Sequence, residues 1–362
     1  MSGSSSRPAL LTRYGIVDRI GSGARATVYL ARAAGPASFE KWIALKRLHP
    51  HLRAERELVR RFLDEARIAA RISHPNVAQV LDVGGDRETS WIAMEYLHGE
   101  TLEALMTAHP PVPRDLGVRI VAEAAEGVHA AHEARTPRGE PLDLVVRDVN
   151  PRNLFVTYDG GVKLVDLGMA KATGRLARTC PGVVTGKIAY VSPEQARGRE
   201  TDRRSDVFAL GVVLWELTTG CPLFRAQNDF ETLANVRACR VPRPSAVVDG
   251  YPQDLEAIVL RALSPDRSAR FATAQELAQA LRMHLVARRV LVTADDVAAH
   301  VRRAFGARIA VKEAALRRAV PEVVELSDDD LVDVQPDWDD APTVSQTGRT
   351  HRAPVALAAM AH

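Results

Sequence analysis

Short runs of hydrophobic and polar residues mark the first part of the chain. From Tyr14 the runs YGIVDRI, TVYLARA and KWIALKRL are rich in β-branched, aromatic and aliphatic residues, and they predict an antiparallel hairpin followed by a third strand. Residues 55–72 carry apolar positions at helical spacing until His74-Pro75-Asn76 stops the pattern, which predicts a helix. Residues 77–85 and 90–96 predict two further strands, so a small β-rich lobe is expected to end near Tyr96.

Beyond Gly99 the pattern becomes helical. Residues 116–134 form a long amphipathic pattern, and residues 206–220 are apolar on nearly every face, which is typical of a buried helix. Between these segments, the β-like runs LDLVV (142–146) and GVKLVDL (161–167) flank a polar loop. Further helical patterns occupy residues 253–290, so a larger helical lobe is expected after the β-rich lobe.

The end of the chain shows one more helical pattern. Thr293-Ala294-Asp295-Asp296 resembles a capping box, and Val297, Val301 and Phe305 then predict an amphipathic helix that packs on the large lobe or on a partner. The sequence from Glu322 to Asp340 holds nine acids and no base, and disorder is expected from about residue 322 to residue 362. The predicted class is α+β, with a flexible N-terminus at 1–12, two lobes at 13–96 and 97–286 that together form one domain at 13–286, a helical extension at 287–320 and a tail at 321–362.

Composition narrows the functional classes. The hydrophobic fraction of 46% and the charged fraction of 26% are those of a globular protein, and no apolar run is long enough for a membrane span. The N-terminal MSGSSSRPALL lacks the apolar core of a secretory signal, which favours the cytoplasm. The chain has three cysteines, and their spacing forms no pair motif, which argues against a disulfide scaffold or a cysteine-rich zinc site. The arginines are scattered without an aromatic ladder, so no nucleic-acid partner is expected.

A glycine-containing turn is the first candidate for chemistry. Gly21-Ser22-Gly23-Ala24-Arg25-Ala26-Thr27-Val28 lies between two predicted strands, and glycines at such a turn let backbone N–H groups approach phosphate oxygens. Taken alone, the segment fits an ordinary glycine-rich hairpin better. A dinucleotide-binding turn is disfavoured, because a strand follows the loop where that fold needs a helix.

Lys46 is the second candidate, since it lies in a predicted strand that is otherwise apolar on that face. An exposed sheet edge would explain the lysine without any function. Glu65, however, lies in the following helix, on the side expected to face the sheet. A partly buried lysine–glutamate pair beside a phosphate-binding turn is a known way of holding the phosphates of a nucleotide. Together the two residues favour a phosphotransferase.

A polar loop supplies the strongest signal. The segment Val145-Val146-Arg147-Asp148-Val149-Asn150-Pro151-Arg152-Asn153 is followed by Asp166-Leu167-Gly168. Asp148 can orient a hydroxyl group and accept its proton, while Asn153 and Asp166 offer the oxygen ligands that magnesium prefers. The same order continues with Ser192-Pro193-Glu194, Asp206 and Arg270.

Over residues 14–286 this series of motifs resembles the eukaryotic-like (Hanks-type) serine/threonine protein kinases of bacteria. The resemblance implies the two-lobed protein-kinase fold and the use of ATP with Mg²⁺, or with Mn²⁺ in its place. It also implies that Lys46 pairs with Glu65 and holds the α- and β-phosphates, that Asp148 is the catalytic base, and that Asn153 and Asp166 bind the metal. Glu194 and Arg270 resemble a buried architectural ion pair. The implied nucleotide-binding residues are Ile20, Gly21, Ser22, Gly23, Ala24, Arg25, Ala26, Thr27, Val28, Ala44, Lys46, Met94, Glu95, Leu97 and Phe155.

The chain departs from the family pattern near the catalytic aspartate. Val146 and Leu167 replace a histidine and a phenylalanine that usually join an apolar stack, and aliphatic residues are expected to keep that stack dry. Asn150 replaces a lysine that neutralises the transferring phosphoryl group, which would remove transition-state stabilisation. Arg152 lies where some tyrosine kinases carry a compensating arginine, although a solvated surface position is the alternative. Lys187 replaces a threonine and is a second candidate for the missing cation.

The leading interpretation is an active kinase that phosphorylates serine or threonine on other proteins and on itself. The alternative is a pseudokinase that binds a nucleotide and acts as a scaffold, but none of the five residues implied to be essential is lost. A small-molecule phosphotransferase is disfavoured by the Ser192-Pro193-Glu194 segment. Further expectations concern regulation: Arg147 and Lys171 would grip a phosphothreonine at Thr179, with Thr173 and Thr185 as other acceptors. In the tail, Thr343 or Thr347 could form a dock for a phosphothreonine-reading partner, or the tail could be only solvated.

Overall fold

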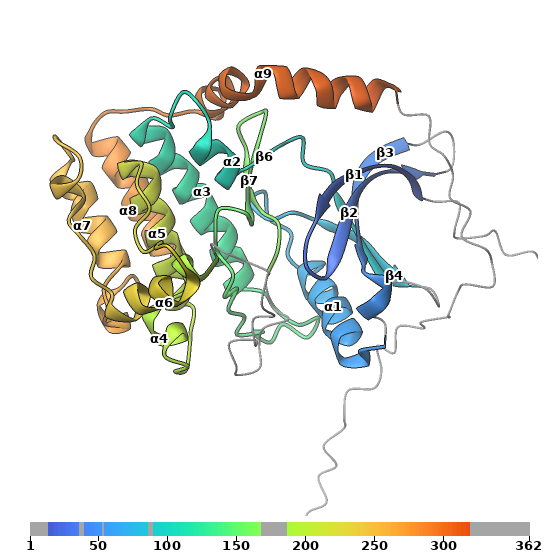
Figure 1. The fold of residues 1–362 in the computed structure, drawn as a ribbon, viewed down its shortest axis with the longest axis horizontal. Helices are drawn as coiled ribbons and strands as arrows, with labels where there is room; N and C mark the ends of the chain where they lie inside the picture. Colours follow the sequence, from blue (N-terminus) through green and yellow to red (C-terminus); the bar gives the residue numbers. More distant parts are fainter. Residues whose placement is uncertain (1–13, 36–39, 53, 86–89, 168–186, 319–362) are drawn as a thin grey trace, which may run out of the picture. The chain divides into compact units, whose positions relative to one another are not determined.

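The structure is a computed structural model that describes residues 14–35, 40–52, 54–85, 90–167 and 187–318. In these segments the chain forms a β-rich N-lobe followed by a helical C-lobe, as the sequence predicts (Figure 1). Residues 95–101, here called the hinge, join the last strand of the N-lobe to the first helix of the C-lobe.

The N-lobe is built on a five-stranded sheet in the order β1-β2-β3-β5-β4. All the strand pairs are antiparallel, and β2 lies opposite β3 without interruption, so Val28 faces Lys46 and Leu30 faces Ala44. Helix α1 packs against the sheet through Phe62 and Ala66. The predicted strands and helix are confirmed, with the bounds β1 Tyr14–Ser22, β2 Ala26–Ala34, β3 Glu40–Leu48, α1 Arg56–Ala69, β4 Val80–Gly85 and β5 Ser90–Glu95.

The C-lobe is centred on helix α5, whose residues from Ser205 to Thr218 are all buried. This confirms the helix that is apolar on nearly every face. The helices α3 and α8 pack against it within one hydrophobic core. The lobe comprises α2 Leu102–Thr107, α3 Arg114–His132, α4 Pro193–Ala196, α5 Arg204–Thr219, α6 Asp229–Ala238, α7 Gln253–Ala262 and α8 Ala274–Ala287.

The end of the hinge forms the first strand of a small sheet in the order β6-β7-β8. Its strands are β6 Gly99–Thr101, β7 Leu154–Thr157 and β8 Val162–Leu164. Of the two β-like runs around the polar loop, the run at 161–167 contains β8. The run LDLVV at 142–146 forms no strand, so that prediction is wrong. β6 and β7 were not predicted.

Contacts with Asp206 explain why residues 142–146 form no strand. The backbone N–H groups of Val146 and Arg147 both donate to the carboxylate of Asp206, at 2.8 and 2.7 Å. His132 contacts the same carboxylate at 2.7 Å. The segment therefore satisfies these donors with a buried side chain of α5 rather than with a sheet partner, and this anchor fixes the start of the loop that carries Asp148.

Two aliphatic residues occupy the predicted apolar stack. Val146 is fully buried and Leu167 is 3% exposed, and both belong to the core of the C-lobe. Both residues are thus buried, as the expectation requires, and their place in a stack that links the lobes stays a prediction.

Helix α9, Ala294–Arg318, confirms the amphipathic pattern near the end of the chain. Its start has the predicted capping box: Thr293 N–H donates to Asp296 Oδ2 at 2.7 Å, and Asp296 N–H donates to Thr293 Oγ1 at 3.2 Å. Val297, Val301 and Phe305 are buried in the core of the large lobe. The helix thus packs on this chain's own C-lobe, and it has a kink at Phe305.

Candidate active site

The predicted catalytic aspartate lies in the loop that begins at Val146 and Arg147, the two residues bonded to Asp206. Asp148 is buried, and its backbone carbonyl accepts hydrogen bonds from the side-chain amides of Asn150, at 2.7 Å, and Asn153, at 2.8 Å. The Asn150 amide also donates to Asp148 Oδ1 at 3.1 Å. These bonds hold the loop in a tight turn, so the carboxylate of Asp148 has a fixed position.

Lys46 lies on β3 and reaches across to the end of β8. Its Nζ lies 3.3 Å from Asp166 Oδ2, and the two side chains are only partly exposed. Burial by itself would lower the pKa of Lys46, but the carboxylates of Asp166 and Glu65 outweigh burial and raise the pKa above its ordinary value. Lys46 is therefore charged at neutral pH, and it lies in one pocket together with Glu65, Met94 and Asp166.

Asn153 and Asp166 are tied together through the backbone. Val165 N–H donates to the carbonyl of Asn153 at 3.0 Å, which brings Asn153, just before β7, close to Asp166, just after β8. The amide nitrogen of Asn153 is committed to Asp148, so its amide oxygen is the atom left for a ligand. One amide oxygen and one carboxylate suit Mg²⁺, which usually takes few protein ligands and completes its shell with phosphate oxygens and water.

The predicted adenine contacts come from both lobes. Val28 and Ala44 lie on adjacent strands of the N-lobe sheet, and Ala44 is paired with Met94. Phe155 lies on β7 opposite Thr101 of the hinge. The remaining predicted contacts follow the same elements: Ile20, Gly21 and Ser22 end β1, Gly23, Ala24 and Arg25 form the turn, Ala26 and Thr27 begin β2, and Glu95 and Leu97 lie in the hinge.

The hinge residue Glu95 has two contacts that the sequence analysis did not predict. Its carboxylate forms an ion pair with Lys163 of β8 at 2.7 Å and accepts from the backbone N–H of Gln79 at 2.8 Å. Lysine is rare in this chain, which was the available signal for Lys163. The bond to Lys163 fastens the hinge to strand β8, and the bond to Gln79 fastens it to the segment just before β4.

The two candidate replacement cations lie in different places. Lys187 Nζ lies 2.9 Å from Asp148 Oδ2, so this lysine reaches the predicted catalytic base. The guanidinium of Arg152 instead contacts both carboxylate oxygens of Glu103 on α2, each at 2.9 Å, and both side chains are exposed. The surface alternative thus describes Arg152 in this structure, and the partner Glu103 carries no signal in the sequence that would have revealed it.

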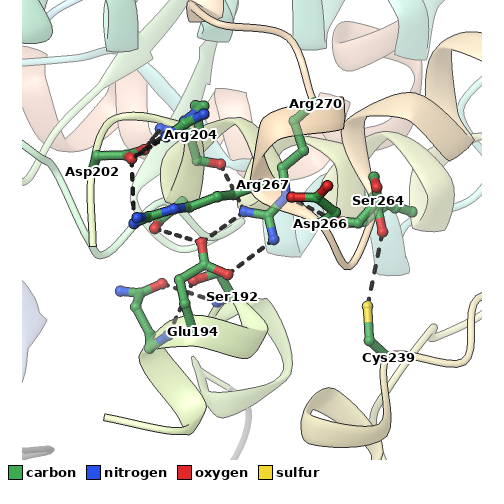
Figure 2. A network of polar contacts seen from close by, with 12 residues as sticks. Ser192, Glu194, Asp202, Arg204, Cys239, Ser264, Asp266, Arg267 and Arg270 are labelled. Atoms are coloured by element: carbon green, nitrogen blue, oxygen red, sulfur yellow. Dashed lines mark hydrogen bonds and ion pairs between the residues drawn. The ribbon is translucent and has the colours of Figure 1, made fainter. Parts of the chain in front are cut away.

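The ion pair expected from Glu194 and Arg270 is present (Figure 2). It is bidentate, with Nη1 2.7 Å from Oε1 and Nη2 2.9 Å from Oε2, and Ser205 donates to the same carboxylate at 2.8 Å. Burial by itself would raise the pKa of Glu194, but the bonds from Arg270 and Ser205 lower it. Removing one partner of such a pair leaves an uncompensated buried charge, at a cost of about 3–5 kcal/mol. The pair therefore fixes α4 to the C-lobe.

Some predicted regulatory residues lie outside the described part of the chain: Lys171, Thr173, Thr179 and Thr185. Arg147 is described and has a left-handed backbone with φ of 60°, held by the bond of its N–H to Asp206. The tail residues Thr343 and Thr347 also lie outside the described residues. Among the described helices, none is long and apolar enough to cross a membrane.

Comparison with known proteins agrees with this geometry. The protein kinase domain family matches residues 14–282. The tyrosine-protein kinase MasK of Myxococcus xanthus is 41% identical over 283 residues, which are 76% of this chain and 44% of MasK. The serine/threonine-protein kinase PrkC of Bacillus subtilis is 32% identical over 265 residues, 73% of this chain and 39% of PrkC.

A solved structure gives the same result for the fold. The kinase domain of PknI from Mycobacterium tuberculosis superposes with a TM-score of 0.56 at 28% identity, covering 78% of this chain and 99% of that domain. The chain spans less than half the length of MasK and PrkC. The match nevertheless includes both lobes and every residue of the site above, and on this ground the chain belongs to the protein kinase domain family, among the bacterial Hanks-type kinases.

Proposed function

We propose that this chain transfers the γ-phosphoryl group of ATP to serine or threonine hydroxyls of protein substrates, its own chain included. The observation that supports this most is the convergence of four side chains from separate elements. Lys46 pairs with Asp166, Asp166 follows the residue bonded to Asn153, and Asn153 holds the turn of Asp148. A phosphoryl-transfer site needs this combination of cation, metal ligands and base.

Each residue has a separate task in the proposed reaction. Lys46 binds the α- and β-phosphates, and Asn153 and Asp166 would hold Mg²⁺, which neutralises phosphate charge when bound. The acceptor oxygen forms a bond to the γ-phosphorus while the bond from that phosphorus to the β–γ bridging oxygen breaks and ADP leaves. Asp148 orients the acceptor hydroxyl and takes its proton. Lys187 is bonded to Asp148. Its positive charge would therefore lie near the phosphoryl group, whose negative charge is redistributed during the transfer.

Tyrosine is a second candidate acceptor, because two observations favour it. MasK, which is 41% identical to this chain, is named as a tyrosine-protein kinase. The chain also has Asn150 and Lys187 where Ser/Thr kinases usually carry lysine and threonine. PrkC and PknB of Mycobacterium leprae, at 32% and 35% identity, are named as serine/threonine kinases, and for this reason we favour serine and threonine.

Identifying the phosphorylated amino acid tests the proposal. The purified chain is incubated with γ-labelled ATP, Mg²⁺ and a generic protein substrate, and the labelled protein is hydrolysed and separated into its phosphoamino acids. We expect phosphothreonine and phosphoserine, with parallel reactions in EDTA giving no label. Label found only in phosphotyrosine would contradict the acceptor class while leaving the phosphotransferase in place.

Two regulatory proposals follow from the positions of threonines in the sequence. Phosphorylation of Thr179 would create charge-assisted bonds to Arg147 and Lys171 and would order the loop that contains it. Phosphorylation of Thr343 or Thr347 would give a phosphothreonine-reading protein a docking point.

A further inference from the structure

The buried carboxylate of the hinge residue Glu100 has partners from two different elements. Glu100 is 6% exposed. Its Oε1 accepts from the hydroxyl of Tyr158 at 2.5 Å and from Lys312 Nζ at 2.8 Å, and its Oε2 accepts from Arg308 Nη1 at 3.0 Å. Lys312 also donates to the backbone carbonyl of Gly99 at 2.7 Å. Two cations from the last helix of the described chain therefore bind two consecutive hinge residues.

Lys312 and Arg308 stabilise the ionised form of the Glu100 carboxylate. Burial by itself would raise the pKa of Glu100, but the hydrogen bonds from Lys312 and Tyr158 and the charge of Arg308 hold it below its ordinary value. Without these two cations, the buried carboxylate would keep only the neutral hydroxyl of Tyr158 from this group. An ionised carboxylate in a buried position is costly unless it is paired with opposite charge, so the helix stabilises this conformation of the hinge.

The hinge residues involved lie next to the proposed adenine site. Gly99 and Glu100 follow the Glu95–Leu97 segment, whose backbone is expected to bond the edge of adenine. β6 also pairs with β7, so that Glu100 faces Val156 and Thr101 faces Phe155. The approach is close: a Cβ atom on Gly99 would lie 2.3 Å from the carbonyl oxygen of Val156. A shift of Glu100 would therefore move both the hinge and the strand that carries Phe155.

The two halves of α9 are attached differently. The first half is anchored in the C-lobe through the buried residues Val297 and Val301. Its start lies close to Gly160, because a Cβ atom on Gly160 would be 1.9 Å from the carbonyl oxygen of Ala294. After the kink at Phe305, the second half holds the hinge through polar contacts, and Val311 on this half is 69% exposed. The first half is thus held by the core, whereas the second half binds the hinge through its charged side chains and touches the core through Ile309.

We propose that the second half of α9 is a hinge clamp, in which Lys312 and Arg308 hold Gly99 and Glu100 in the conformation that receives the nucleotide. Both cations are positioning residues, since they act on the nucleotide through the hinge. This inference rests on the proposed function for its effect on ATP, but the grip of the helix on the hinge can be measured without ATP. The family match ends at residue 282, so the clamp lies outside the matched domain.

The test compares two substitutions on the same helix in the full chain. Lys312→Met keeps the length of the side chain and removes its charge, whereas Arg317→Met removes a charge that is 69% exposed and pairs only with Glu313 one turn away in the described structure. Lys312→Met should weaken ATP binding, measured by calorimetry with Mg²⁺, by about tenfold, because a charged hydrogen bond to a buried group is lost. Its KM for ATP should rise while kcat at saturating ATP stays within about twofold of the wild type. Lys312→Arg should restore much of the affinity, and Arg317→Met should match the wild type.

Hydrogen exchange separates the clamp from the proposed function. Amide exchange in peptides covering residues 96–107 should be faster in Lys312→Met than in Arg317→Met, with no nucleotide present. If exchange is unchanged, or if it is faster but the affinity for ATP stays that of the wild type, the clamp proposal is overturned. If the wild type binds no nucleotide, the proposed function fails, and faster exchange would still support the grip of the helix on the hinge.

Discussion

Replacing Lys46 by methionine is expected to abolish phosphoryl transfer, with activity lowered by about 1000-fold or more. The methionine keeps an unbranched side chain on β3 but removes the ammonium group that pairs with Asp166 at 3.3 Å. Asp166→Asn should have a comparable effect, because it removes the charge of a proposed metal ligand. Initial rates at saturating ATP and Mg²⁺ measure both effects.

A matched control exists on the same strand. Lys41 also lies on β3 and is exposed, so Lys41→Met makes the same chemical change away from the site and should leave activity unchanged. Thermal unfolding of all three variants shows whether any loss of activity comes from a loss of structure. Near-normal activity of Lys46→Met or Asp166→Asn would show that the site is wrongly assigned.

Lys187→Met is expected to lower kcat by about 100-fold and to leave the KM for ATP nearly unchanged, which is the pattern of a contact made mainly in the transition state. The reason is the 2.9 Å contact between Lys187 Nζ and Asp148 Oδ2, together with Asn150 in the place of the usual lysine. Lys187→Arg, which keeps the positive charge, should retain part of kcat. Steady-state kinetics with varied ATP measure both constants.

Arg152 provides the comparison for Lys187. The sequence offered both residues as candidates for the missing cation, but the guanidinium of Arg152 contacts Glu103 on the surface. Arg152→Ala should therefore reduce kcat much less than Lys187→Met. A wild-type kcat in Lys187→Met would mean that the site functions without this charge, and a larger loss in Arg152→Ala would mean that Arg152 leaves Glu103 during catalysis.

The N-lobe and the buried helix were predictable because their patterns are local. The runs of β-branched, aromatic and aliphatic residues in β2 and β3 and the continuous burial of α5 are properties of the side chains in those segments. The run at 142–146 was predicted wrongly, since its apolar residues fit a strand. The competing interaction came from Asp206, which is distant in the sequence and takes the N–H groups of Val146 and Arg147.

The candidate site was predictable as a set of residues but not as a set of contacts. The order of Lys46, Asp148, Asn153 and Asp166 along the chain carried the assignment. Which cation reaches Asp148 depends on the path of two loops, and no pattern in the sequence distinguishes Arg152 from Lys187 in this respect. The clamp was likewise invisible, because the pairing of Glu100 with Lys312 joins residues that lie far apart in the chain.

The most direct test of the central claim is phosphoryl transfer by the wild-type chain beside Asp148→Asn. Both proteins are incubated with γ-labelled ATP, Mg²⁺ and a protein substrate, and their binding of ATP is measured separately. The account predicts label on the substrate with the wild type, label lowered by about 100-fold or more with Asp148→Asn, and similar ATP binding by the two proteins. Wild-type protein that binds ATP but transfers no more phosphate than Asp148→Asn would contradict the account and would identify the chain as a nucleotide-binding pseudokinase.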